Sequence, residues 1–329
     1  MVVRIKDVAA AAQVSPATVS RVLAGRAVDE AMRARVLAAV EATGYRPNLA
    51  ARRLRSRHTN TIGLIVADIR NPFFTAVSRA VEHLAYARGL RVILANTDED
   101  PEKEAMYLQL MQEERVTGVI LAATRAGLDQ LARQPFDFPT VLIDRTAPHV
   151  MADQVVLDNG AMAGLLVDHL AASGHRRIAG LFGAASATGL ERQLGYEAAM
   201  ARAGLAAQAV PVPHGAGATE RIVSALLTAP QPPEALIASN GVMLTAALRA
   251  VRALGAAAPP GLAMAGFDNE PWMDCLSTGL AVIEQPVEEI GRSAMAMLMD
   301  RLEHAEAPVR KVVLRGQLVL REAGQGTPG

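Results

Sequence analysis

The sequence predicts an N-terminal all-α helix-turn-helix headpiece followed by an α/β body of two doubly wound lobes. In the first 57 residues, apolar side chains recur at helical spacing on both sides of a short turn. From Thr61 onward, short β-rich runs alternate with helical stretches, which is the pattern of parallel sheets covered by helices. With 329 residues, the chain is long enough for two or three units.

Charge separates the same two parts. Residues 1–60 hold eleven Arg and Lys against four Asp and Glu, a formal charge of +7. Because the whole chain is formally neutral, the remainder carries −7. A basic head on an acidic body is typical of a protein in which one part contacts phosphates.

Other classes are disfavoured by composition. Cys275 is the only cysteine, so neither a disulfide framework nor a cysteine-based metal site is expected. No apolar run approaches the roughly 18 residues that span a bilayer. The N-terminus lacks the apolar stretch of a signal peptide. We therefore expect a cytoplasmic protein without a membrane partner.

The headpiece is expected to contain three helices, at about 6–12, 16–23 and 29–43. Ser15 is a candidate N-cap of the second helix, and Pro16 suits its first position. Asp29 is a candidate N-cap of the third helix, and Gly44 its left-handed stop. The inward faces are formed by Val8, Ala9, Ala12, Val19, Val22 and Leu23.

The second helix leaves Pro16, Ala17, Thr18 and Arg21 exposed. In a helix-turn-helix, these positions meet base edges and phosphates in the major groove.

The basic segment after Tyr45, at 46–57, has two interpretations. One is a short helix at about 47–55 that becomes ordered only on DNA and a partner copy, with Leu54 as a wedge in the minor groove. The other is a solvated basic linker in which Leu54 merely caps a domain.

The body is expected to contain two parallel sheets. Strands are predicted at 61–67, 91–94, 116–121, 140–143, 155–157, 177–182, 235–238, 262–267 and 281–283. Helices are predicted at 73–88, 101–114, 159–173, 190–203, 218–228, 241–254 and 287–302.

Asp and Asn side chains follow many of these strands. Ligands of open α/β sheets bind beyond the carboxyl ends of the strands. Carboxylate and amide groups there suit a polyhydroxylated ligand. The alternative is that they are ordinary loop and cap residues. The positions are Asp68, Asp98, Asp144, Asp158, Asn240 and Asp268.

Several motifs together resemble the lactose-repressor (LacI/GalR) family of bacterial transcription regulators. In the headpiece they are Ile-Lys-Asp-Val-Ala (5–9), Val-Ser-Pro-Ala-Thr-Val-Ser-Arg-Val-Leu (14–23), Gly-Tyr-Arg-Pro-Asn (44–48) and Leu54. In the body they are Thr-Ile-Gly-Leu-Ile-Val-Ala-Asp (61–68), Asn-Pro-Phe-Phe (71–74), Ala-Asn-Thr-Asp-Glu-Asp (95–100), Gly-Phe-Asp-Asn (266–269) and Ile-Glu-Gln-Pro (283–286).

The resemblance implies a division of the chain. A DNA-binding headpiece with its hinge helix would occupy 1–57. A periplasmic sugar-binding-protein-like body for effector binding and dimerisation would occupy 60–329. Its N-lobe would comprise about 60–155 and 285–315, and its C-lobe about 156–283 and 316–325, with three connections and a ligand cleft between them.

The resemblance also implies DNA-contacting residues. Pro16, Ala17 and Arg21 would read bases, and Thr18 and Ser20 would contact phosphates or neighbouring base edges. Leu54 would open the central operator step. The full DNA-binding set is Ser15, Pro16, Ala17, Thr18, Ser20, Arg21, Asn48, Arg52 and Leu54. Ala24 replaces the family's usual Asn, which puts one helix-end backbone contact in question.

For the effector, the resemblance implies that Phe73 and Phe74 form a pocket wall and that Asp144, Asn240 and Asp268 bind by hydrogen bonds. Trp272 would cover a sugar ring, or alternatively pack at the lobe edge.

Two departures from the family affect this pocket. Leu190 stands where the family has a ligand-binding Arg, and Gly241 where it has Asp. The pocket is thus expected to lose a cation and an anion. Arg145 is a candidate substitute cation, for a sugar acid.

The leading hypothesis is a repressor that binds a palindromic operator as a homodimer, under control of a sugar or sugar-acid effector. A sugar-binding transport receptor shares the body fold, but it would need a signal peptide and no basic headpiece. An enzyme is not expected, because neither a Gly-x-Ser-x-Gly elbow nor a His-Glu-x-x-His pair is present. No cofactor or metal is predicted.

Overall fold

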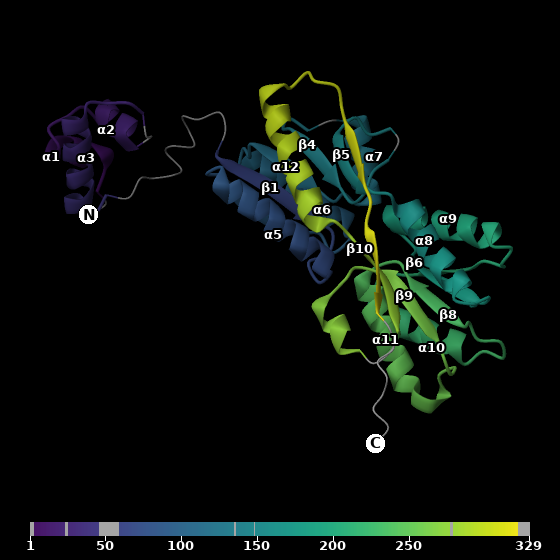
Figure 1. Ribbon diagram of the computed structural model, residues 1–329. Helices are drawn as coiled ribbons and strands as arrows, with labels where there is room; N and C mark the ends of the chain where they lie inside the picture. Colours follow the sequence, from purple (N-terminus) through teal and green to yellow (C-terminus); the bar gives the residue numbers. More distant parts are fainter. Residues whose placement is uncertain are drawn as a thin grey trace. The chain divides into compact units, whose positions relative to one another are not determined.

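The computed structural model describes residues 3–23, 26–45, 59–134, 136–147, 149–276 and 279–321. These residues form two compact units, which meet in sequence between Thr59 and Asn60. The unit that begins at Asn60 contains two six-stranded sheets (Figure 1). The predicted headpiece and doubly wound lobes are therefore confirmed. The hinge prediction at 47–55, with Asn48, Arg52 and Leu54, lies outside the described residues, as does Ala24.

The first unit contains the helices α1 (Ile5–Ala11), α2 (Pro16–Leu23) and α3 (Glu30–Thr43), each within one residue of its prediction. Ser15 Oγ accepts from Thr18 N at 3.1 Å, and Asp29 Oδ1 accepts from Met32 N at 3.1 Å, so both predicted N-caps are present. Gly44 ends α3 with a φ of 63°, the left-handed geometry that favours glycine. The small core that holds the helices together is centred on Val8, Val19 and Val36.

The first sheet of the body has the strand order β11-β5-β4-β3-β1-β2, and all its strand pairs are parallel. Helices α5 (Pro72–Ala87) and α12 (Val287–Glu303) pack on one face. Helices α6 (Pro101–Glu113) and α7 (Arg125–Arg133) pack on the other. The strands are β1 (Thr61–Val66), β2 (Arg91–Asn96), β3 (Gly118–Leu121), β4 (Thr140–Ile143), β5 (Asp153–Leu157) and β11 (Lys311–Leu314).

The second sheet repeats this arrangement in the order β12-β10-β9-β8-β6-β7, with only β12 antiparallel. Helices α8 (Asn159–Ala172) and α9 (Ala187–Arg202) cover one face. Helices α10 (Ala218–Leu227) and α11 (Gly241–Leu254) cover the other. Two 3₁₀ turns lie at Gly255–Ala257 and Pro271–Cys275. The strands are β6 (Ile178–Gly183), β7 (Gln208–Val212), β8 (Ala235–Ala238), β9 (Ala263–Phe267), β10 (Leu280–Glu284) and β12 (Gln317–Arg321).

The chain crosses between the sheets three times: after β5, after β10, and between β11 and β12. In each sheet the first strand lies between the second and the third, so the strand order reverses there. Ligands of doubly wound sheets bind beyond the strand ends at that point.

The elements that were not predicted are mostly at sheet edges. Strands β7, β11 and β12 are edge strands with exposed residues, and β7 contains Pro211, which a central strand rarely tolerates. Helix α7 was also missed, and β3 begins at Gly118 rather than at 116. No helix among the described residues is long and apolar enough to cross a membrane.

Helices α8 and α9 pack so closely that their contact requires glycine. A Cβ on Gly195 would lie 2.3 Å from Gly160 O and 2.5 Å from Gly160 Cα. We expect Gly195→Ala to lower the free energy of unfolding by about 1–3 kcal/mol, because the two backbones must separate. Gly164→Ala on α8 is the control. Its Cβ meets nothing closer than 3.6 Å, so higher helix propensity should stabilise the protein by about 0.5–1 kcal/mol. If urea denaturation showed that both variants change the free energy of unfolding in the same direction, this description of the packing would be contradicted.

Candidate functional site

A cavity of about 890 Å³ lies where the carboxyl ends of the two sheets meet. It is lined by loops that follow strands of both sheets and by the N-terminal turns of α5, α7, α9, α10 and α11. Side chains cap four of these helices: Asn71 on α5, Thr124 on α7, Ser186 on α9 and Asn240 on α11. The cavity is thus where a ligand of a doubly wound fold is expected.

All seven predicted effector-binding residues line this cavity. Phe73 and Phe74 are buried, with their ring centroids 5.0 Å apart in an edge-to-face arrangement. Trp272 lies in the turn Pro271–Cys275 and is 37% exposed. Of the six polar strand ends, Asp68, Asp144, Asn240 and Asp268 line the cavity. Asp98 and Asp158 do not, since Asp98 pairs with Lys103 and Asp158 caps α8.

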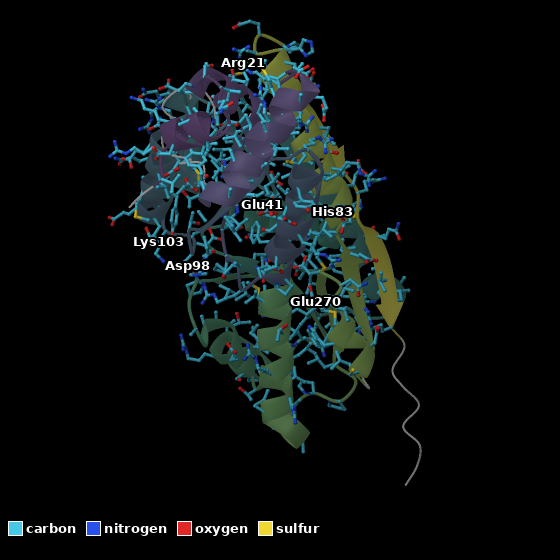
Figure 2. All side chains as sticks on the ribbon, turned by 90° about the vertical axis from the view of Figure 1, so that its left-hand side faces the viewer. Arg21, Glu41, His83, Asp98, Lys103 and Glu270 are labelled. Atoms are coloured by element: carbon cyan, nitrogen blue, oxygen red, sulfur yellow. The ribbon has the colours of Figure 1, made fainter. Side chains whose placement is uncertain are left out.

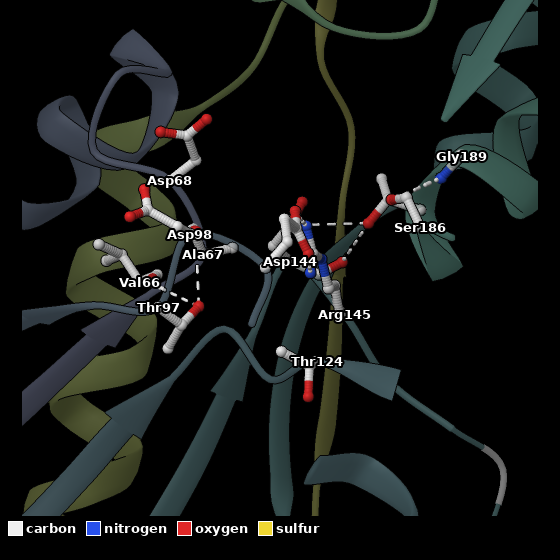
Figure 3. A network of polar contacts seen from close by, with 12 residues as sticks. Val66, Ala67, Asp68, Thr97, Asp98, Thr124, Asp144, Arg145, Ser186 and Gly189 are labelled. Atoms are coloured by element: carbon white, nitrogen blue, oxygen red, sulfur yellow. Dashed lines mark hydrogen bonds and ion pairs between the residues drawn. The ribbon is translucent and has the colours of Figure 1, made fainter. Parts of the chain in front are cut away.

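Two strand-end aspartates have left-handed backbones. Asp144 has a φ of 65° and Asp268 a φ of 74°, which non-glycine residues adopt only when their surroundings hold them. Thr188 Oγ1 donates to Asp144 Oδ2 at 3.4 Å, which links the end of β4 to the first turn of α9. Asp144 and its neighbour Arg145 are labelled in Figure 3. Burial raises the pKa of the Asp144 carboxyl above its ordinary value.

Asp268 is held by the residues around it. Its Oδ1 accepts from Gln285 Nε2 at 2.6 Å, and its Oδ2 accepts from Gly241 N at 2.8 Å. A Cβ on Gly241 would lie 3.1 Å from Asp268 Oδ2, so the small residue at 241 lets the carboxylate approach the helix terminus. Asn240 Oδ1 caps α11 by accepting from Met243 N at 2.8 Å.

The expected role of Arg145 as a substitute cation needs correction. Its Nη1 and Nη2 both donate to the carboxylate of Glu99, and its Nε lies 3.3 Å from Asp144 Oδ2. Burial acts against its charge, but these carboxylates outweigh burial and raise the pKa of Arg145. Arg145 therefore lines the cavity as a paired ion rather than as a free cation.

A second arginine, Arg192, was not among the predicted ligands. Its Nε donates to Asn159 Oδ1 at 2.8 Å, its Nη1 donates to Ser239 O, and its guanidinium lies 3.8 Å from the ring centroid of Phe267. Its buried Nη2 has no hydrogen-bond partner among the described residues, and burial lowers the pKa of Arg192. Leu190 stands where the family has a ligand-binding arginine. It is 53% exposed and does not line the cavity.

Gln285 Oε1 is a further buried atom without a partner among the described residues. Arg145 Nε is also buried without a hydrogen bond, although it lies 3.3 Å from Asp144 Oδ2. Among the described residues that line the cavity there are thus two buried cationic donors without a hydrogen-bond partner, Arg145 Nε and Arg192 Nη2, and one such acceptor, Gln285 Oε1. Buried polar atoms of this kind cost free energy unless a ligand or water satisfies them.

The predicted DNA-contacting residues of the first unit lie on or beside α2. Ser15, Pro16, Ala17 and Arg21 are exposed, and Thr18 and Ser20 are half-buried (Arg21 is labelled in Figure 2). The hydroxyl oxygens of Ser15 and Thr18 are 2.9 Å apart, so these two hydroxyls are partly engaged in the cap.

Comparison with known proteins places these features in a family. The model for bacterial regulatory proteins of the lacI family matches residues 4–48, and a periplasmic binding protein-like domain matches residues 167–323.

Two of the similar proteins span nearly the whole chain. The transcriptional regulator PtxS of Pseudomonas plecoglossicida is 34% identical over 97% of this chain and 95% of its own. The ribose operon repressor of Halalkalibacterium halodurans is 34% identical over 98% of this chain and 97% of its own.

Solved structures agree with these matches. A putative ribose operon repressor from Burkholderia thailandensis has a TM-score of 0.71 and 34% identity over 80% of this chain and 99% of its own. The lac repressor dimer bound to operator has a TM-score of 0.84 over 98% of this chain and 99% of its own, and its 22% identity supports the fold alone. With an exposed helix-turn-helix, two doubly wound lobes and relatives of this coverage, the chain belongs to the lacI family of bacterial regulatory proteins.

Proposed function

We propose that this protein is a transcription repressor that binds a palindromic operator as a homodimer and whose operator affinity depends on a polyhydroxylated effector in the cavity of the body. In this proposal, 1–57 is the DNA-binding part with a hinge helix at about 47–55. Residues 60–329 bind the effector and dimerise. No enzymatic activity is assigned to the cavity.

The observation that carries the effector part is the pair of unsatisfied buried atoms, Arg192 Nη2 and Gln285 Oε1. A ligand that satisfies both atoms must offer an acceptor to Arg192 and a donor to Gln285, and hydroxyl groups supply both. Phe73, Phe74 and Trp272 supply apolar surface for a ring. The printed names of relatives support this choice, since one is a ribose operon repressor and a similar structure is a regulator in complex with cellobiose.

The DNA part rests on the exposed face of α2 and on the charge of +7 over residues 1–60. A two-fold operator needs two headpieces, so a dimer is the smallest assembly that fits. Effector binding between the lobes would shift the population of lobe arrangements, and with it the spacing of the two headpieces.

We expect Arg21→Ala to weaken binding to the operator by about 1–3 kcal/mol, or roughly 5- to 150-fold, because Arg21 is proposed to read a base edge. Gel-shift titrations with the operator and with a random duplex would measure the change. Arg33→Ala, an exposed arginine on α3, removes the same charge and is the matched control. Equal losses on both duplexes would argue against base reading by Arg21, and a wild-type protein without preference between the duplexes would refute the proposed function.

A further inference from the structure

The ion pair between Arg145 and Glu99 joins residues that are 46 positions apart in the sequence. Arg145 follows β4, and its side chain is 7% exposed. Glu99 lies in the loop between β2 and α6 and also lines the cavity. Both terminal nitrogens of Arg145 meet the carboxylate of Glu99, which is the bidentate geometry that most strongly neutralises a guanidinium. A ligand therefore meets an arginine whose charge is already paired.

The backbone that presents Glu99 is held in a costly conformation. Asp98 and Glu99 have consecutive left-handed φ values of 53° and 62°, which non-glycine residues adopt only when their surroundings hold them. Asp98 is anchored on the outer side of this loop by Lys103 Nζ at 2.8 Å and Asn96 Nδ2 at 2.9 Å (Figure 2). The left-handed turn therefore directs two adjacent carboxylates to different partners, with Asp98 on Lys103 and Glu99 on Arg145.

The charges around the cavity do not favour an anionic ligand. Five arginines and seven aspartates or glutamates line it, so these side chains sum formally to −2. Two of the acids, Asp68 and Asp268, are buried, where like charges repel more strongly than in water. A ligand carboxylate would bring the sum to −3, whereas a neutral polyol leaves it unchanged.

We infer that Glu99 is a specificity-determining residue, which occupies Arg145 and so makes the cavity select a neutral polyhydroxylated effector over the corresponding acid. The inference rests on the proposed function, because it concerns the ligand of the same cavity. It replaces the expectation that Arg145 receives a sugar acid. Without the carboxylate of Glu99, Arg145 would keep its contact with Asp144, but its two terminal nitrogens would lose their carboxylate partner and could bind a ligand anion.

Calorimetric titration of the full chain would test this with matched pairs of compounds: D-ribose, D-glucose and D-galactose, each beside its aldonate. Where the wild type binds an aldose or its aldonate, we expect it to bind the neutral aldose at least tenfold more tightly than the aldonate. Glu99→Gln keeps the shape of the side chain and removes its charge. It should shift the ratio of the two dissociation constants toward the acid by about 10- to 100-fold, the range of a charge-assisted hydrogen bond. Asp98→Asn is the matched control, since it removes one charge from the neighbouring residue outside the lining and should leave the ratio unchanged.

The possible results separate this inference from the proposed function. An aldonate that bound the wild type as tightly as its aldose, or an unchanged ratio in Glu99→Gln, would overturn the role of Glu99 and leave a sugar-responsive regulator intact. The same shift in Asp98→Asn would also overturn it, because the effect would then be one of overall charge. Binding of no compound by any of the three proteins would overturn both the inference and the effector part of the proposed function. Operator binding, measured separately, reports on the DNA part.

Discussion

Asp153→Ala is expected to lower the free energy of unfolding by about 3–5 kcal/mol, the largest loss of stability anticipated for a single change in this protein. The side chain of Asp153, at the start of β5, is fully buried. Arg301 on α12 donates to both of its oxygens at 3.0 Å, and Arg310 N donates to Oδ1 at 2.8 Å. Removal of the carboxylate leaves Arg301, whose side chain is only 13% exposed, without its counter-charge.

Urea denaturation of the full chain would measure this loss, with Asp168→Ala as the control. Asp168 pairs with Arg202 at 3.2 Å, but both side chains are more than half exposed, so this pair should contribute at most about 1 kcal/mol. The double change Asp153→Ala with Arg301→Met should cost less than the sum of the single changes, because no lone charge remains buried. A loss below about 1 kcal/mol for Asp153→Ala would show that the buried pair does not hold α12 to the sheet.

The features that the sequence predicts well are those that local chemistry decides. Ser15, Pro16 and Asp29 mark helix starts because capping depends on residues only a few positions apart. The strand-end rule finds Asp144 and Asp268 because the carboxyl ends of parallel strands share one edge of a sheet. Applied to β10, the same rule would also have found Gln285, which directly follows that strand.

What the sequence does not show is how the side chains of the site pair with one another. Helical spacing places Arg192 on the buried face of α9, four residues before Tyr196, and Arg202 off that face, but this spacing does not name a partner for Arg192. Only the packing of α9 against α8 places Arg192 beside Asn159. Likewise, the strand-end rule selects Asp98, whereas the left-handed turn brings its neighbour Glu99 to the cavity. These outcomes depend on tertiary contacts between residues that are distant in the chain.

Arg192→Met is expected to weaken effector binding by about 2–5 kcal/mol, or roughly 30- to 5,000-fold, with little change in operator affinity when no effector is present. Methionine keeps much of the apolar stem of Arg192 but loses the guanidinium that lies over the ring of Phe267. It removes the unsatisfied Nη2 donor that we assign to the effector, together with the hydrogen bonds to Asn159 and Ser239. The operator occupancy of the variant should therefore stay unchanged at effector concentrations that change the occupancy of the wild type.

Titration of operator binding over a range of effector concentrations separates a lost ligand contact from a damaged fold. A lost contact shifts the effector midpoint and leaves the binding curve without effector in place, whereas damage to the second lobe also lowers the melting temperature and the amount of active protein. Arg249→Met is the matched control. Arg249 also lines the cavity, but its side chain is 67% exposed and lies 3.8 Å from Glu220, so its loss should move the midpoint by no more than a few-fold. Equal shifts in the two variants would mean that the cavity responds to overall charge, and that the buried donor of Arg192 does not anchor the effector.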